Sequence, residues 1–227
     1  MWGRALVCLS VLPWPLASAA PWVQREGFGY ARASIAAETL DDEQGWRSDA
    51  FLEYGVTDRW TATAKLETVT HPQIPEEDRL GGRVTLRGSI YETDVLSVTG
   101  EVGFIQGAAI GGRNGCDTPG MEWRGGAAVS YKLFARNAYA FGEMVRRDHE
   151  ACLRDRIEMG AGLELTQSLS ASAQLWIEDG EPSAPSEKIQ TELLWRRGDA
   201  DYSFGYRKEL GNAFEEESLF LAFAHRF

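Results

Sequence analysis

An alternation of apolar and polar residues with a period of two recurs along most of this chain and constrains its fold more than any other feature. Side chains of an extended strand point alternately to its two faces, so this period gives each segment one apolar and one polar face. Turn-forming Gly, Asp, Asn, Pro and Ser separate the segments. The pattern predicts an all-β, antiparallel, up-and-down fold of twelve strands, at residues 28–39, 46–54, 60–70, 83–91, 95–105, 121–134, 138–147, 154–166, 171–178, 188–196, 202–208 and 218–227.

The sequence ends on an aromatic residue that belongs to the last of these segments. From Ser218 to Phe227, alternate positions carry Leu, Leu, Phe, His and Phe. This segment resembles the terminal strand of bacterial outer-membrane β-barrels, where alternate apolar residues ending in Phe form the insertion signal. The resemblance assigns that signal to Phe223, His225 and Phe227, although the family often has Tyr where this chain has His225. It implies a porin-like transmembrane β-barrel of a Gram-negative bacterium, of no specific subfamily. Its implied partners are outer-membrane lipid, lipopolysaccharide and, through this strand, the barrel-assembly machinery.

Residues 1–20 have the composition of a secretory signal peptide. Arg4 precedes a short apolar run, and the segment ends in Ala17-Ser18-Ala19-Ala20, which is typical of a cleavage site. The apolar run is too short for a membrane-spanning helix, which needs about 20 apolar residues. We therefore expect a signal peptide at 1–20, followed by one barrel domain at 21–227 in the outer membrane.

The connections between segments favour a membrane barrel over a soluble one. Alternation alone does not show which face points outward, because a soluble barrel encloses its apolar face and a membrane barrel exposes it. However, the connections after even-numbered segments are tight, and those after odd-numbered segments are mostly longer. Short periplasmic turns and longer extracellular loops are typical of outer-membrane barrels. Segment seven alternates less clearly and the Gly-rich loop at 107–120 is long, so ten to fourteen strands are possible.

Large aromatic residues fall near the ends of the predicted strands, on the apolar face. Amphipathic rings prefer the depth of the lipid headgroups, so two aromatic girdles are expected in a membrane barrel. The residues concerned are Trp46, Trp60, Tyr91, Trp123, Tyr131, Trp195, Tyr202, Tyr206 and Phe227.

The polar face carries basic and acidic residues in nearly every segment, and in a membrane barrel this face lines the lumen. Two interpretations remain open: a ladder of ion pairs that fills a narrow barrel, or a water-filled pore whose charges select solutes. The pore-lining candidates are Arg32, Glu53, Lys65, Arg83, Arg87, Glu101, Arg124, Lys132, Glu158, Glu192 and Arg207.

The overall charge excludes one class of partner. The chain has 23 basic and 34 acidic residues, and loss of Arg4 with the signal peptide would leave 22 against 34, or −12. A chain this acidic is a poor nucleic-acid binder, because phosphate backbones attract basic surfaces.

Cysteine and histidine positions restrict the possible chemistry. Cys116 and Cys152 fall in the third and fourth predicted outer loops, where they could form a disulfide or remain free thiols. His149 and Cys152 lack a second pair with zinc-like spacing, so no metal site is expected. A twelve-stranded outer-membrane phospholipase family has a Ser-Asn-Gly stretch that this chain lacks, and His71, His149 and His225 have no Ser partner at strand spacing. We expect no catalytic residue and no cofactor.

These features favour a narrow, porin-like channel for small solutes. A non-conducting barrel with a structural or adhesive role through its outer loops is the first alternative, and an outer-membrane lipid-modifying enzyme is the second. The sequence leaves the solute and the oligomeric state open.

Overall fold

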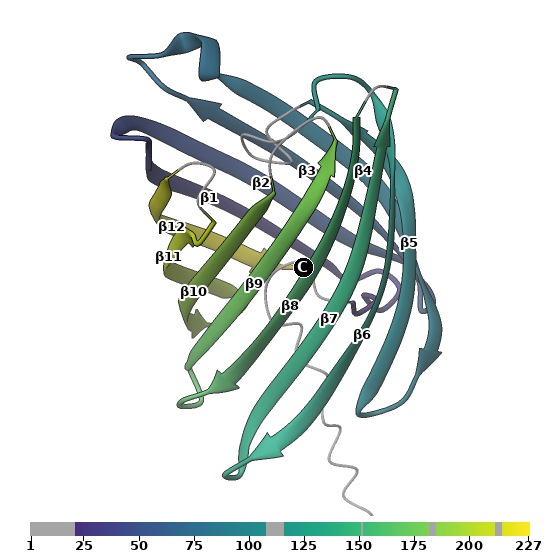
Figure 1. Ribbon diagram of the computed structural model, residues 1–227. Coiled ribbons are helices and arrows are strands. Elements are labelled where there is room, and N and C mark those ends of the chain that lie inside the picture. The colour runs from purple at the N-terminus through teal and green to yellow at the C-terminus, as the bar shows by residue number, and fades with distance from the viewer. Residues whose placement is uncertain (1–20, 108–115, 151, 182–184, 212–214) are drawn as a thin grey trace, which may run out of the picture.

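The computed structural model describes residues 21–107, 116–150, 152–181, 185–211 and 215–227, which form a closed antiparallel β-barrel (Figure 1). Each predicted segment corresponds to one strand, and the predicted all-β, up-and-down fold of about twelve strands is confirmed. The predicted signal peptide at 1–20 lies outside the described residues. The strands are β1 (Gly29–Leu40), β2 (Glu43–Thr57), β3 (Trp60–Thr70), β4 (Arg79–Glu92), β5 (Leu96–Gln106), β6 (Gly120–Leu133), β7 (Arg136–His149), β8 (Cys152–Glu164), β9 (Leu169–Glu181), β10 (Ser186–Arg197), β11 (Ala200–Glu209) and β12 (Glu216–Arg226).

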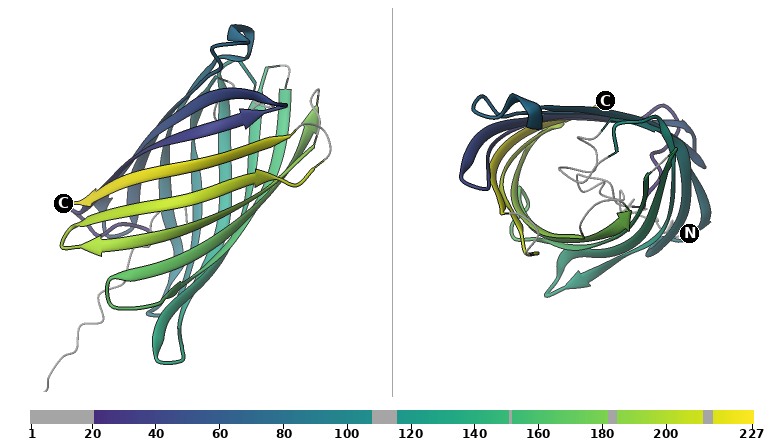
Figure 2. Two further views of the ribbon diagram at one scale, coloured as in Figure 1. Left: turned by 90° about the vertical axis from the view of Figure 1, so that its left-hand side faces the viewer. Right: turned by 45° about the horizontal axis from the view of Figure 1, so that its top comes forward.

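The terminal strand closes the barrel. β12 pairs antiparallel with β1, with Leu221 opposite Ile35, and every other strand pairs with its neighbours in sequence. The view in the right half of Figure 2 shows the strands as one continuous ring. A closed ring has no free edge, so backbone N–H and C=O groups within the wall pair with neighbouring strands, as a bilayer requires.

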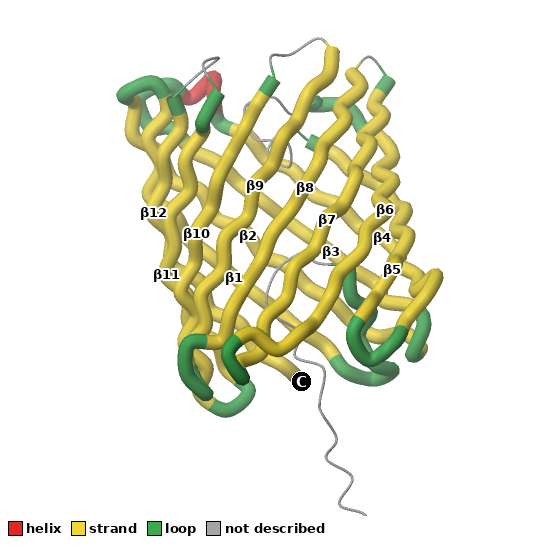
Figure 3. Tube along the Cα trace, turned by 60° about the horizontal axis from the view of Figure 1, so that its bottom comes forward, coloured by secondary structure: helices red, strands yellow, loops and turns green. Residues whose placement is uncertain are grey.

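The strand connections gather at the two ends of the barrel, as Figure 3 shows. We call the end with the turns after β2, β4, β6, β8 and β10 the turn end, and the C-terminus lies there too. The other end, which holds the 3₁₀ helix η1 (Pro75–Glu77), is the loop end. The expected alternation of short and long connections fails at two points of the loop end. Only Asp41 and Asp42 join β1 to β2, and only residues 150 and 151 separate β7 from β8.

Backbone geometry corrects the predicted start of two strands. Asp41 and Asp42 have φ values of 48° and 73°, the left-handed conformation that a two-residue hairpin turn needs and that Asp tolerates. This compact turn lets β2 start at Glu43 rather than at residue 46. A second compact turn, at Phe134 and Ala135 with φ values of 49° and 61°, lets β7 start at Arg136 rather than at residue 138.

The outer surface of the barrel is apolar. Leu66, Val84 and Phe104 expose 54%, 62% and 71% of their surface, whereas most of their sequence neighbours on the other face are buried. The predicted aromatic residues also point outward, with Tyr206 the most covered of them. Within the described part of the chain, no helix is long and apolar enough to cross a membrane.

Three aromatic rings lie along the inner wall, each against a glycine directly opposite on the next strand. Tyr139 faces Gly162, Phe141 faces Gly160 and Phe220 faces Gly205. A Cβ atom at Gly162 would lie 2.0 Å from the Tyr139 ring, and one at Gly205 would lie 2.2 Å from Phe220. Glycine at these positions provides the space into which the rings fold.

We expect Gly162→Ala to lower the free energy of unfolding by about 1–3 kcal/mol, because the new methyl group displaces the Tyr139 ring. Urea unfolding of the refolded barrel, followed by its heat-modifiable gel mobility, measures the change. Gly125→Ala is the matched control, since a Cβ atom there meets nothing within 4 Å. Equal unfolding midpoints for the two variants would contradict the proposed ring–glycine fit.

Candidate functional site

The inner wall of the barrel is built from charged side chains. Alternation along each strand directs the charged face inward, and most of these groups are buried, with Arg87 and Glu122 fully enclosed. Buried charges are costly unless they are paired and hydrogen-bonded. The arrangement of pairs therefore decides how the lumen is held together.

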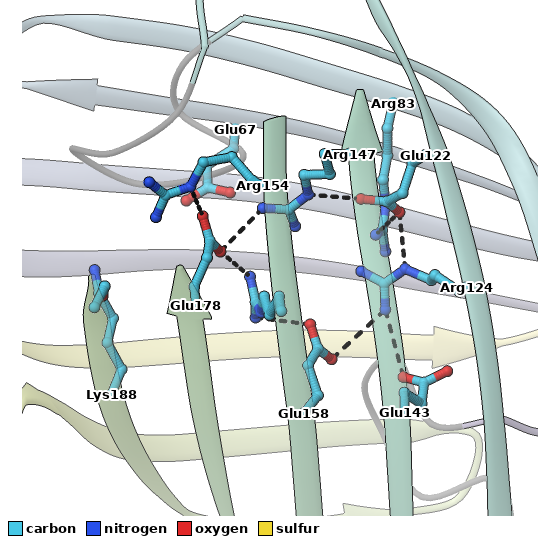
Figure 4. A network of polar contacts seen from close by, with 12 residues as sticks. Glu67, Arg83, Glu122, Arg124, Glu143, Arg147, Arg154, Glu158, Glu178 and Lys188 are labelled. Atoms are coloured by element: carbon cyan, nitrogen blue, oxygen red, sulfur yellow. Dashed lines mark hydrogen bonds and ion pairs between the residues drawn. The ribbon is translucent and has the colours of Figure 1, made fainter. Parts of the chain in front are cut away.

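Glu122 on β6 is the hub of the largest group of ion pairs (Figure 4). One carboxylate oxygen accepts hydrogen bonds from Arg83 Nη1 and Arg124 Nε, both at 2.8 Å, and the other accepts one from Arg147 Nε at 2.8 Å. Three guanidinium groups from β4, β6 and β7 therefore share one carboxylate. Charge-assisted bonds of this kind are stronger than neutral ones.

The pairs continue around the wall from this hub. Arg147 reaches Glu178 on β9 at 3.2 Å, and Arg154 Nε donates to the same carboxylate at 3.0 Å. Arg124 lies 3.5 Å from Glu158 on β8, and Arg156 lies 2.8 Å from it. We call this set the central network: Arg83, Glu122, Arg124, Glu143, Arg147, Arg154, Arg156, Glu158 and Glu178.

A second group of charges lies towards the loop end. Arg47 on β2 pairs with Glu38 at 2.5 Å, with Glu67, and with Glu216 on β12 at 3.7 Å. Lys188 on β10 pairs with Glu216 at 2.5 Å. These ion pairs connect both sides of the β1–β12 seam from the inside.

His71 belongs to this group, although a lone histidine in a loop is expected to be solvated. It is 1% exposed, and its Nε2 lies 3.8 Å from Glu38 Oε1. Its backbone N–H donates to Asp78 at 2.6 Å, which joins the two ends of the β3–β4 connection. The sequence does not reveal this burial, because it depends on how the loop folds.

Most predicted pore-lining residues lie on the inner wall. Lys132 does not: it is exposed at the turn end, where its Nζ bonds Asn137, because β6 extends beyond the enclosed part of the wall. Lys65 and Arg207 face inward and are partly exposed. The remaining eight are enclosed in ion pairs on the inner wall: Arg32, Glu53, Arg83, Arg87, Glu101, Arg124, Glu158 and Glu192.

Several residues of the inner wall are not among the predicted pore-lining candidates. Arg147 on β7 and Glu178 on β9 are central to the network. Segment seven alternates weakly, because its outward positions carry small or charged residues such as Gly142 and Arg146, whereas Glu178 ends the polar face of segment nine. Trp176 also faces inward, and the guanidinium carbons of Arg156 and Arg207 lie 5.3 and 5.4 Å from its ring centroid. The inward and outward positions of the regularly alternating strands, extended across the cross-strand pairs to β7 and β9, would have placed these residues on the inner wall.

Arg207 differs from the arginines of the central network. Its Nε and Nη2 both donate to Gln190 Oε1, at 3.1 and 2.9 Å, rather than to a carboxylate. Among the described residues, no carboxylate oxygen lies within 4 Å of this guanidinium. Arg207 is therefore a positive charge on the inner wall that is not neutralised by direct contact.

Residues 21–28 precede β1 and run inside the barrel near the turn end; we call them the N-terminal strap. Arg87 Nη1 donates to the Trp22 carbonyl at 3.0 Å, and the Gln24 backbone N–H donates to Thr61 Oγ1 at 2.7 Å. The Trp22 ring packs edge-on against Tyr139, with 5.6 Å between ring centroids. The alternating pattern begins at residue 28, so it predicts no position for this segment.

The remaining predicted sites are located as follows. Cys116 and Cys152 form a disulfide with Cα atoms 6.1 Å apart, and Cys152 is the first residue of β8 rather than a loop residue. His149 is buried at the end of β7, where its Nδ1 lies 2.5 Å from the Thr118 carbonyl oxygen. His225 faces outward, and the residues opposite it, Ala31 and Ala200, carry no hydroxyl group. In the described ranges, no group of three or more His, Cys, Asp or Glu residues could hold a metal ion.

Comparison with known proteins places the fold. No family model matches the chain, and no curated protein matches its sequence significantly. Among solved structures, an outer-membrane channel from Pseudomonas putida F1 aligns with a TM-score of 0.64 and 12% identity over 93% of this chain and all of that one. The KdgM porin aligns with a TM-score of 0.61 and 6% identity, covering 86% of this chain and 99% of the porin. LpxR from Salmonella typhimurium aligns with a TM-score of 0.54 and 9% identity, covering 86% and 99%. The chain therefore has the twelve-stranded, porin-like fold of outer-membrane barrels.

Proposed function

We propose that this protein is a narrow, porin-like channel of the outer membrane that passes small solutes. The observation that carries the proposal is the inner wall, which is charged from the loop end to the turn end and is enclosed by an apolar outer surface. Polar groups at membrane depth are expensive and mark a pathway by default. The similarity to solved porins supports the same function.

The partly exposed basic residues are the groups that a permeating ion would meet first. The arginines of the central network are neutralised by carboxylates at 2.8–3.5 Å. Arg207 bonds Gln190 instead, and no carboxylate of the described residues contacts it directly, so it is less neutralised than they are. Permeation would then depend on Arg207 more than on the neutralised pairs.

Arg207→Gln is expected to reduce the anion-to-cation permeability ratio about two- to fivefold, since one unit charge at close range in water is worth about 1 kcal/mol. Reversal potentials of residues 21–227, refolded into a planar bilayer under a salt gradient, measure this ratio. Lys132→Gln removes the same charge outside the enclosed wall and serves as the control. A folded barrel that shows no discrete current steps, with or without the N-terminal strap, would overturn the channel proposal.

A second candidate is a barrel that does not conduct and acts through its loop end. The density of buried ion pairs across the lumen favours it, because paired charges can fill a barrel as well as line a pore. Absence of ionic current through every folded variant in the bilayer experiment would favour this candidate.

A further inference from the structure

The N-terminal strap connects wall positions that are far apart around the barrel. Its contacts on one side are Glu53 on β2, Thr61 on β3 and Arg87 on β4. Its contact on the other side is Tyr139 on β7. β2 and β7 lie five positions apart in a ring of twelve strands, so they stand on nearly opposite walls. The contacts of the strap therefore extend over nearly half of the ring, from inside the barrel.

The inner wall is shaped to receive the strap. A Cβ atom at Gly55 would lie 1.9 Å from the Arg25 carbonyl oxygen, so glycine there admits the strap backbone. Gly27 N–H donates to the Gly55 carbonyl, and Gly55 N–H donates to the Phe28 carbonyl, both at 2.9 Å. These bonds fix the direction in which the chain enters the barrel.

The strap also occupies charged groups of the wall. Arg87 Nη1 divides its contacts between the Trp22 carbonyl at 3.0 Å and Glu53 Oε1 at 2.9 Å. Gln24 Nε2 donates to the other oxygen of Glu53 at 3.0 Å. The same Arg87 and Glu53 are pore-lining candidates, and the strap covers them.

The attachment is nevertheless limited. Pro21 is fully buried, but Trp22, Val23 and Gln24 are only partly buried, and Arg25 to Phe28 are exposed. The strap precedes β1 and forms no strand of its own. A segment held by a few separated contacts opens more readily than the wall around it.

We propose that the N-terminal strap is a plug that restricts the lumen at the turn end and that can leave without unfolding the barrel. This inference rests on the proposed channel function. When the strap is seated, its backbone and the Trp22 ring obstruct the lumen. When it leaves, Arg87, Glu53 and Thr61 become accessible from the turn end.

The test compares single-channel currents of the refolded chain with those of Trp22→Ala/Gln24→Ala and of a deletion of residues 21–26. Both changes remove wall contacts of the strap, and heat-modifiable gel mobility shows whether each variant has folded. We expect a severalfold rise in unitary conductance or in open time for both. Arg25→Ala is the matched control, because Arg25 lies on the same segment with its side chain exposed, and no hydrogen bond or ion pair joins that side chain to the described part of the wall.

A second measurement locates the strap without relying on current. In Gln24→Cys/Glu53→Cys, a short bifunctional thiol reagent should link the two residues, whose side chains meet at 3.0 Å. Arg25→Cys/Glu53→Cys is the control pair, and the native cysteines are already joined. The cross-link between the strap and β2 should keep the unitary conductance at the low value of the unmodified chain.

The outcomes separate the two proposals. Equal conductance of the strap variants and the unmodified chain overturns the plug and leaves the channel standing. Absence of the cross-link in the folded barrel also overturns the plug, because the strap then does not occupy this seat. Absence of current in every folded variant overturns the channel, and the plug falls with it.

Discussion

Replacing Glu122 with glutamine is expected to lower the free energy of unfolding by about 3–5 kcal/mol, the range seen when one partner of a buried ion pair is removed. Glu122 has no exposed surface and neutralises Arg83, Arg124 and Arg147 together. Glutamine fills nearly the same volume but leaves these three guanidinium groups without their shared charge. The decrease in the free energy of unfolding therefore measures the contribution of charge pairing rather than of packing.

Urea titration of the barrel in lipid vesicles measures this change, with the folded fraction read from gel mobility. Glu217→Gln is the matched control, since Glu217 bonds Lys208 on the outer surface and both side chains are about half exposed. We expect little change there, because water and salt screen an exposed pair. Glu122→Asp keeps the charge but shortens the side chain, so it should fall between the two. If Glu122→Gln and Glu217→Gln unfolded at the same urea concentration, the central network would not stabilise the barrel.

Loss of the Cys116–Cys152 disulfide is expected to lower the free energy of unfolding by about 2–4 kcal/mol. The bond joins residues 36 positions apart and encloses the β6–β7 hairpin, so it restricts the unfolded chain more than a short link would. It also ties the connection before β6 to the first residue of β8.

The comparison is between the unmodified chain and Cys116→Ser/Cys152→Ser, each unfolded with and without a reducing agent. The reducing agent should shift the unfolding midpoint of the unmodified chain to that of the double variant and leave the double variant unchanged. A shift in both proteins would mean that reduction acts elsewhere. No shift in either would mean that the bond does not stabilise the fold.

The fold could be predicted because a strand's alternation is local. Ile35 and Leu221 point outward for the same reason that Arg87 and Glu101 point inward. Side chains alternate between the two faces of a strand, so the direction of one residue fixes the direction of its neighbours. Short turns such as Asp41-Asp42 and Gly198-Asp199 then set the order of strands along the barrel. Aromatic residues near strand ends, such as Trp46 and Trp60, indicated which parts of the strands lie at the level of the lipid headgroups.

The ion-pair partners could not be predicted, because they are not local. Arg83 on β4 meets Glu122 on β6, and Arg124 on β6 meets Glu158 on β8, so each pair passes over the strand between them. Side-chain length and barrel curvature decide such contacts, and neither is visible in a strand pattern. Lys132 could not be placed for a similar reason. It lies on the same face of β6 as Glu122 and Arg124, but at the exposed end of the strand, beyond the enclosed wall. The strap was missed because its seat depends on Gly55 and Thr61, which are far from it in sequence.

Arg47 and Glu216 lie near opposite ends of the chain, yet their charges meet across the β1–β12 seam. Such a contact can form only after the last strand has been placed beside the first. Interactions absent from a folding transition state slow unfolding without accelerating folding. The inner charges would then act mainly as a kinetic lock: they contribute little to the speed of assembly, but once the seam has closed they lengthen the lifetime of the barrel in the membrane.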